Sequence, residues 1–489
     1  MKRFALLFTL FTLLSLGVHA QVTLPALVGD NMVLQRNTTV NLWGRAPAHT
    51  TVTLTPSWNQ ATYTCQANSQ GKWQVAVPTS SAGGPYTLTL KNGSHERVLS
   101  HILLGEVWIS SGQSNMEFPV CGFVNQPCFG SAEAVLESVQ YPDIRLFEVI
   151  RVSCDTPQED CPGSQWLTAT YDNVARFSAV SYFFAKELNR ALGIPIGIIT
   201  TNWGGSSIEA WMSEEAILAT QGIHYDLCRA FDEQHTRIAG LYNGMLTPLF
   251  PFTAKGFIWY QGETNRPAYF DYDKLMVSLV RLWREKWGND HMPFYYVQLA
   301  PYRYNGEERR TLPLTVEAQY KALAQIPYSG IAATTDLGHT SCIHPPKKIE
   351  VGQRLAFLAL ANDYGVVGLP APAPTFKSMS VEDNVVTVRF NHLSDGSPNE
   401  PNSLNGFTET KVRPILGFEI AGADQKFYPA KGNFLWWQNA IQLRADEVPH
   451  PVAVRYAFTN VPNANVVTTY GQPLVPFRTD DWEIPESEL

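Results

Sequence analysis

Short runs in which hydrophobic and polar residues alternate occupy residues 22–100. The clearest are residues 51–54, 73–77 and 86–90, and Gly, Asn and Pro residues separate them. Because successive side chains of a β-strand point to opposite faces, this period of two predicts half-buried antiparallel strands. We therefore expect residues 21–100 to form a β-rich accessory domain that supplies no contact to a catalytic site.

The pattern changes at about residue 101, where apolar runs begin to alternate with helical segments. Three runs have the length of buried strands: residues 106–110, 196–200 and 256–260. Three longer segments repeat apolar residues every three or four positions, as one face of a helix does: residues 180–192, 271–288 and 347–364. Strands that alternate with helices predict a parallel sheet covered by helices on both faces. We expect this three-layer α/β/α sandwich to span residues 101–368.

Residues 369–374 read Leu-Pro-Ala-Pro-Ala-Pro, which is typical of a proline-rich linker. Strand-like runs return beyond it, at residues 385–390, 440–443 and 452–458. We expect residues 375–489 to form a C-terminal β-rich segment.

The first twenty residues have the composition of an export signal. Lys2 and Arg3 precede an apolar stretch over residues 4–18, and Val18-His19-Ala20 forms a small-x-small cleavage site. We expect residues 1–20 to be a removed signal peptide and the mature protein to be periplasmic or secreted. No later segment has about 20 unbroken apolar residues, so we expect no membrane insertion.

The overall composition narrows the choice of partner. A net charge of −8 argues against nucleic acid, because phosphate binding needs a basic surface. Hydrophobic residues make up 45% and charged residues 16%, which indicates a globular chain rather than a disordered one. Aromatic residues reach 12%, including 13 Trp, and this fits a sugar-binding surface and a large core equally well.

Export would make disulfides available to the seven cysteines. The pairs Cys121/Cys128 and Cys154/Cys161 are spaced to close small loops, although the sequence leaves the connectivity open. The odd number implies a free thiol or an intermolecular bridge. The spacing does not match a zinc site.

Four short loops carry residue types that are used in acyl transfer. Ser114, Gly205 and Asn265 each follow a predicted strand, and His344 precedes a predicted helix. Alone, each residue has an ordinary explanation: a polar turn, a glycine turn, a helix cap and a structural histidine. Together they fall at the end of a parallel sheet where ligands and nucleophiles of α/β proteins lie.

This chain order of Ser, Gly, Asn and His resembles the SGNH hydrolases. The surrounding residues resemble one group of them more closely, the sialate O-acetylesterase family. The resemblance lies in GEVW at residues 105–108 with GQSNM at 112–116, LYNGM at 241–245 with WYQGETN at 259–265, and IHP at 343–345 with GQRLA at 352–356. It extends to the β-rich ends, through NMVLQR at 31–36 and PVAVRY at 451–456.

The resemblance implies an esterase that removes O-acetyl groups from sialic acids or sialoglycans through an acetyl-enzyme intermediate. Ser114 is then the nucleophile and His344 the general base. The backbone N–H groups of Ser114 and Gly205 and the Asn265 amide form the oxyanion hole. No metal or cofactor is required. The candidate substrate-binding residues are Gln113, Gln261, Glu263, Arg266 and Arg303.

One position departs from the family pattern, which has an Asp three residues before the His. This chain has Ser341 there. His344 still needs an acceptor at Nδ1 so that Nε2 is free to take the serine proton. We expect a main-chain carbonyl from residues 338–342 to be that acceptor, with the Ser341 hydroxyl and the Asp336 carboxylate as alternatives.

Three other functions fit parts of the pattern. A glycosidase would use paired carboxylates, and Glu209 and Glu263 lie in the relevant loops. A non-catalytic sugar-binding relative would explain the absent Asp. An acetyl esterase acting on plant polysaccharide such as xylan would keep the same catalytic residues.

Overall fold

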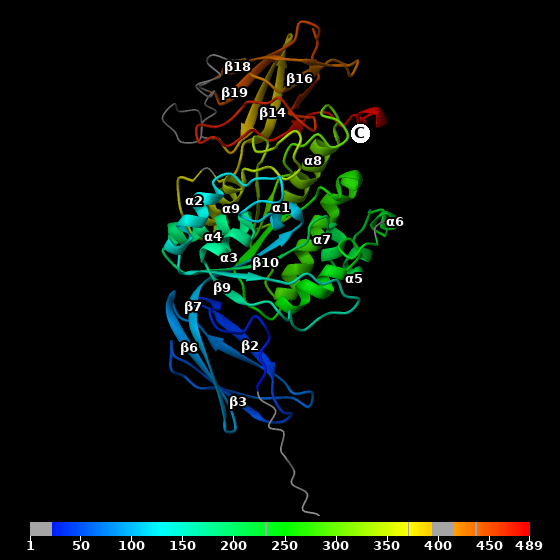
Figure 1. The fold of residues 1–489 in the computed structure, drawn as a ribbon. Coiled ribbons are helices and arrows are strands. Elements are labelled where there is room, and N and C mark those ends of the chain that lie inside the picture. Colours follow the sequence, from blue (N-terminus) through cyan, green and yellow to red (C-terminus); the bar gives the residue numbers. More distant parts are fainter. Residues whose placement is uncertain (1–21, 230–231, 370, 394–413, 436–437) are drawn as a thin grey trace, which may run out of the picture.

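We analysed a computed structural model, which describes residues 22–229, 232–369, 371–393, 414–435 and 438–489. Figure 1 shows a central α/β domain with a smaller β domain at each end. The predicted signal peptide lies outside the described residues. No helix in the described ranges is long and apolar enough to cross a membrane.

The N-terminal domain is built mainly from short antiparallel strands, as the alternating pattern predicts; its first strand instead pairs parallel with its last, with Val33 opposite Leu103. Its strands are β1 (Val33–Gln35), β2 (Thr39–Arg45), β3 (Thr51–Pro56), β4 (Tyr63–Gln66), β5 (Lys72–Pro78), β6 (Gly83–Asn92) and β7 (His95–Gly112). Strand β2 pairs with β5, whereas β3, β4 and β6 join the first part of β7. The inward side chains, such as Val52 and Leu54, are fully buried.

Strand β7 belongs to two domains. Its first part pairs antiparallel with β6, and the part from Glu106 onward pairs parallel with β10 (Ile196–Asn202) and β11 (Gly256–Tyr260). The boundary that we placed at residue 100 therefore falls inside one continuous strand. The buried Glu106 carboxylate accepts hydrogen bonds from Gln35 Nε2 at 2.8 Å and from Arg36 Nε at 2.6 Å, which ties the N-terminal domain to the central sheet.

The central sheet has the strand order β13-β12-β11-β7-β10-β8-β9. The strands not yet defined are β8 (Ile144–Glu148), β9 (Trp166–Thr168), β12 (Phe294–Val297) and β13 (Ser329–Ala332). Neighbours are parallel except at the β9 edge, which is antiparallel to β8. This agrees with the predicted parallel sheet.

Helices cover both faces of this sheet, which gives the expected α/β/α sandwich. The helices are α1 (Ser114–Glu117), α2 (Ser131–Glu137), α3 (Tyr171–Arg176), α4 (Ala179–Leu192), α5 (Glu214–Leu218), α6 (Tyr225–Cys228), α7 (Tyr269–Trp287), α8 (Thr311–Leu323) and α9 (Lys348–Asp363). Consecutive residues of β11 show the two faces: Ile258 packs in the cluster of α4 and α9, whereas Trp259 contacts Trp283 of α7 with ring centroids 5.5 Å apart. Much of the aromatic content is therefore core.

The described residues of the C-terminal segment form a sandwich of two four-stranded sheets. One sheet is β14 (Thr375–Glu382), β15 (Val385–Asn391), β19 (Ala440–Arg444) and β18 (Lys431–Leu435); the other is β17 (Phe427–Pro429), β16 (Phe418–Ala421), β20 (Ala453–Tyr456) and β21 (Phe477–Arg478). Both sheets contribute to one hydrophobic cluster. The Arg478 guanidinium pairs with Glu317 of α8, which attaches the sandwich to the central domain.

None of the seven cysteines forms a disulfide, and all seven lie in the described residues. The two candidate loop-closing pairs are therefore unbridged. Among the described residues, no group of three or more His, Cys, Asp and Glu side chains is arranged to hold a metal ion.

Candidate active site

The first candidate residue, Ser114, begins helix α1 directly after β7 ends. Gly112 makes this turn, since its φ is 146° and a Cβ there would lie 2.1 Å from the Tyr260 carbonyl oxygen. Ser114 is partly exposed, and within the described residues neither its Oγ nor its N–H has a hydrogen-bond partner. Ser114 therefore offers both a hydroxyl and a backbone N–H to a ligand at the carboxyl end of β7.

Gln113 holds the neighbouring loop in place. Its Oε1 accepts hydrogen bonds from the N–H groups of Gly262 at 3.2 Å and Thr264 at 3.4 Å, and its own N–H donates to the Tyr260 carbonyl at 3.0 Å. The side chain is buried. In the structure Gln113 thus joins two loops of the candidate site.

The glycine loop packs directly on Ser114. A Cβ at Gly204 would lie 3.3 Å from the Ser114 Cβ, and the Gly204 N–H already donates to Glu117 Oε2 at 2.6 Å. Gly205 has a φ of 77°, in the left-handed region, and its N–H has no partner in the described part of the chain. Of the two glycines, Gly205 is therefore the one with an N–H available to an oxyanion.

Asn265 is held from several sides. Its Oδ1 accepts from the Ile208 N–H at 2.9 Å and from Gln261 Nε2 at 2.7 Å, and its Nδ2 donates to the Glu209 oxygens at 3.1 and 3.0 Å. Glu209 is the only acceptor of Nδ2 among the described residues, and an amide nitrogen carries two N–H groups, so one of them can turn to an oxyanion. Burial is the largest influence on Glu209 and raises its pKa, which the hydrogen bond from Asn265 partly opposes.

His344 meets an acceptor that we did not predict. Its Nδ1 lies 2.5 Å from Oε1 of Gln126, a half-buried residue in the loop after α1. The expected main-chain carbonyl from residues 338–342 is thus wrong. The alternatives are wrong as well, because Asp336 forms a two-point ion pair with Arg354 at 2.7 Å and Ser341 Oγ lies 3.4 Å from His339 Nδ1. Gln126 is a neutral acceptor, as the expected carbonyl would have been. No local pattern in the sequence marks Gln126 as the partner of His344.

The environment of His344 favours its neutral form. Burial, and then the positive charge of Lys348, lower the pKa of His344 to about 4. With Nδ1–H donating to Gln126, the Nε2 lone pair is free at neutral pH. No hydrogen bond joins Nε2 to Ser114 Oγ in the structure, and such contacts often shorten only when substrate binds.

Three of the other candidate substrate-binding residues point inward. Gln261 donates to the Ser206 carbonyl at 3.1 Å, Glu263 accepts from Asn115 at 2.5 Å, and the Arg266 guanidinium lies 4.2 Å from the centre of the Tyr304 ring. All three side chains are buried. Arg303 differs: it is exposed, and its N–H donates to the Thr340 carbonyl at 3.3 Å, which places it beside the loop of His344.

The two carboxylates of the glycosidase alternative are engaged elsewhere. Glu209 holds the Asn265 amide and Glu263 holds the Asn115 amide. Because both carboxylates are buried and committed to neighbouring side chains, neither is presented to a sugar.

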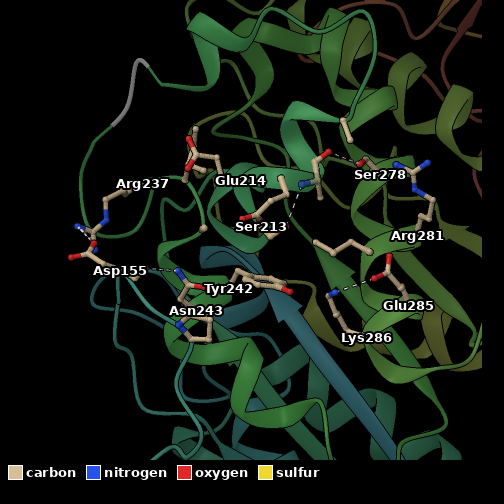
Figure 2. A pocket seen from close by; sticks show the side chains of 17 residues that line it. Asp155, Ser213, Glu214, Arg237, Tyr242, Asn243, Ser278, Arg281, Glu285 and Lys286 are labelled. Carbon is tan, nitrogen blue, oxygen red and sulfur yellow. Dashed lines mark hydrogen bonds and ion pairs between the residues drawn. The ribbon is translucent and has the colours of Figure 1, made fainter.

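A separate polar cavity of about 980 Å³ lies between α5, the segment 237–243 and α7 (Figure 2). Figure 2 shows Asp155, Arg237, Tyr242, Arg281 and Lys286 around it, with an Arg237–Asp155 ion pair of 3.0 Å. None of the four candidate catalytic residues lines this cavity.

The three-layer fold, with its central and mostly parallel sheet, defines the class of SGNH-type hydrolases. A family profile described as "carbohydrate esterase, sialic acid-specific acetylesterase" matches residues 104–361, and the chain belongs to this family. It is 29% identical to human sialate O-acetylesterase over 385 residues, which cover 71% of this chain and 72% of that protein. Mouse sialate O-acetylesterase is 25% identical over 499 residues, 89% of each chain.

A solved structure extends the similarity over almost the whole chain. It is a carbohydrate acetylesterase from Xanthomonas citri, with a TM-score of 0.84 and 35% sequence identity, covering 94% of this chain and 100% of that one. Together with the curated esterases, these matches show that the chain is a carboxylic ester hydrolase.

Proposed function

We propose that this enzyme hydrolyses O-acetyl esters of sialic acids, with Ser114 as nucleophile and His344 as general base. The observation that carries the proposal is the Ser114 hydroxyl after β7, beside the N–H groups of Ser114 and Gly205; none of these three groups has a hydrogen-bond partner among the described residues. The similarity to sialate O-acetylesterases supports the substrate class.

The first half of the reaction forms an acetyl-enzyme. His344 Nε2 takes the proton from Ser114 Oγ as Oγ bonds to the acetyl carbon. The carbonyl oxygen becomes an oxyanion, which the N–H groups of Ser114, Gly205 and Asn265 stabilise, each by on the order of 3 kcal/mol. His344 then returns the proton to the sugar oxygen as the C–O ester bond breaks.

The second half releases acetate. His344 takes a proton from water as its oxygen bonds to the acetyl carbon, and the same donors hold the second oxyanion. Ser114 Oγ leaves with the proton from His344, and the free enzyme is restored. The neutral Gln126 acceptor supports the imidazolium less than a carboxylate would.

Arg303 is the candidate contact for the sialate carboxylate, because it is exposed beside the His344 loop and pairs with no acidic group among the described residues. A second candidate substrate is an acetylated neutral polysaccharide such as xylan. The similar enzyme from Xanthomonas citri is a carbohydrate acetylesterase, which supports the wider class of acetylated carbohydrates.

We also propose that the protein is exported to the periplasm or secreted. The basic start, the apolar stretch and the small-x-small site of residues 1–20 support this. N-terminal sequencing of the mature chain, expected to begin at Gln21, tests it.

Acetate release from O-acetylated sialic acid and from acetylated xylan tests the function. We expect faster release from the sialate with the wild type and a loss of about a million-fold in Ser114→Ala, as for other serine-hydrolase knockouts. Ser341→Ala is the matched control, because it removes an exposed hydroxyl three residues before His344. More than a few per cent of residual activity in Ser114→Ala would reject the nucleophile, and faster release from xylan would reject the sialate.

A further inference from the structure

The residue after the nucleophile connects the site to a buried pair of opposite charges. Asn115 is 1% exposed, and its Oδ1 accepts from Lys348 Nζ at 2.5 Å. Its Nδ2 donates to Glu263 Oε1 at 2.5 Å and to the Ile343 carbonyl at 3.0 Å. One amide thus joins the Ser114 turn to α9, to the loop after β11 and to the residue before His344.

The orientation of this amide follows from its partners. An ammonium can only donate, whereas a carboxylate and a carbonyl can only accept, so the oxygen must face Lys348 and the nitrogen must face Glu263 and Ile343. The amide dipole then lies between a cation and an anion, with each end towards the opposite charge. A flipped amide would lose all three hydrogen bonds.

Neither Lys348 nor Glu263 forms an ion pair with any described residue, and both instead hydrogen-bond to the Asn115 amide. Lys348 is fully buried, and its ammonium lies 4.9 Å from the centre of the Phe118 ring and 5.5 Å from that of Tyr260. Glu263 Oε2 has no hydrogen-bond partner. A buried ion that loses a hydrogen-bond partner is strongly unfavourable, so each ion holds Asn115 firmly.

We infer that Asn115, clamped between Lys348 and Glu263, is a positioning residue that sets the spacing of the Ser114 turn and the His344 loop. Lys348 has a second effect, because its positive charge opposes protonation of His344. This inference rests on the proposed roles of Ser114 and His344. In this proposal, Asn115 keeps His344 near Ser114 and Lys348 keeps the imidazole neutral, in a site where no carboxylate accepts from Nδ1 of His344.

The groups around His344 allow the effect of the Lys348 charge on the pKa of His344 to be tested separately from the positioning role of Asn115. Lys348 of α9 is the charged group that acts on His344, and Cys342 of the same loop donates to the His344 carbonyl at 3.1 Å. Glu263, Cys128 and Cys342 act in turn on Lys348. Gln126 and the rings of Phe118 and Phe123 are uncharged neighbours. Burial raises the pKa of the Cys128 thiol to about 11, so it stays neutral, and burial lowers the pKa of Lys348 to about 7.

The first test is Asn115→Leu, which has a similar volume and no amide. We expect kcat to fall by about 10- to 100-fold with KM within about threefold, because misplacement acts on the transition state. An unchanged kcat would overturn the inference, as would a loss confined to KM. Glu263→Gln keeps the acceptor oxygen without the charge. We expect this variant to fold and to lose less activity than Asn115→Leu. An equal or larger loss of activity in Glu263→Gln would also overturn the inference.

The second test is Lys348→Met, with the exposed neighbour Lys347→Met as matched control. We expect the acid limb of the kcat/KM profile to move to higher pH by about 0.5 unit in Lys348→Met alone. A lower plateau with an unmoved limb would overturn the electrostatic role. Ser114→Ala assayed in parallel separates the inferences: if Ser114→Ala is inactive but the two tests fail, only the role of Asn115 and Lys348 is rejected.

Discussion

Replacing Gln126 by Glu tests whether the neutral acceptor of His344 controls its basicity. The variant keeps an oxygen at the position that lies 2.5 Å from Nδ1 and adds one negative charge. With the imidazolium and carboxylate charges centred about 4 Å apart and an effective dielectric constant near 20, their attraction is about 4 kcal/mol, or roughly 3 pKa units.

Partial exposure reduces this figure. Both side chains are half-buried, so solvent screening lowers the expected rise to about 2 units. The pKa of His344 is now lowered to about 4 by burial and by Lys348. Since the neutral imidazole is the active form, activity is lost as the pH falls through this pKa. Gln126→Glu should therefore move the acid limb from about pH 4 to about pH 6 and raise the plateau, because the imidazolium of the transition state is better stabilised.

The assay is the pH dependence of kcat/KM for acetate release between pH 3.5 and 8.5, a window of roughly two units on either side of the expected limb. Gln140→Glu is the matched control, since it changes the net charge equally at an exposed position. Gln126→Ala should lower kcat by about 10- to 100-fold without the shift, because Nδ1 loses its acceptor. An unmoved limb in Gln126→Glu would refute the assignment of Gln126 as the partner of Nδ1.

Three further outcomes follow from the geometry. Asn265→Ala should cut kcat by about a hundredfold with little change in KM, and a raised KM with an unchanged kcat would make Asn265 a ground-state residue. Arg303→Ala should raise KM for O-acetylated sialic acid by about tenfold and leave that for acetylated xylan unchanged; equal effects on both would argue against a carboxylate contact. Gly112→Ala should lower the free energy of unfolding in urea by about 2–3 kcal/mol, because its Cβ would lie 2.1 Å from the Tyr260 oxygen, and a neutral effect would contradict that geometry.

The proposed dyad of Ser114 and His344 differs from a full triad in how the imidazole is oriented and how its charge is stabilised. A carboxylate at Nδ1 both orients the imidazole and stabilises its charged form. Here Gln126 supplies orientation only, and Lys348 acts against the charged form. Such a site keeps its base neutral well below pH 6, at the cost of a weaker proton acceptor. We therefore expect activity to persist in mildly acidic solution.

The sequence by itself determined the elements that local periodicity encodes. The apolar face over residues 271–288 became α7, and the run over 256–260 became β11, because burial of one face or of a whole strand imposes its period on the chain. It also placed Ser114, Gly205 and Asn265 at one sheet edge, since the carboxyl ends of parallel strands meet there. The continuity of β7 through residue 100 was not visible, because both halves have strand-like composition.

Only the tertiary structure decided which side chains meet across long separations in the chain. Gln126 reaches His344 over 218 positions, and Lys348 reaches Asn115 over 233. No local pattern marks such contacts, because they depend on how loops from different strands close over the sheet. The same holds for direction: Glu263 and Arg266 are charged residues in an active-site loop, yet both turn inward, where an amide and an aromatic ring compensate their burial.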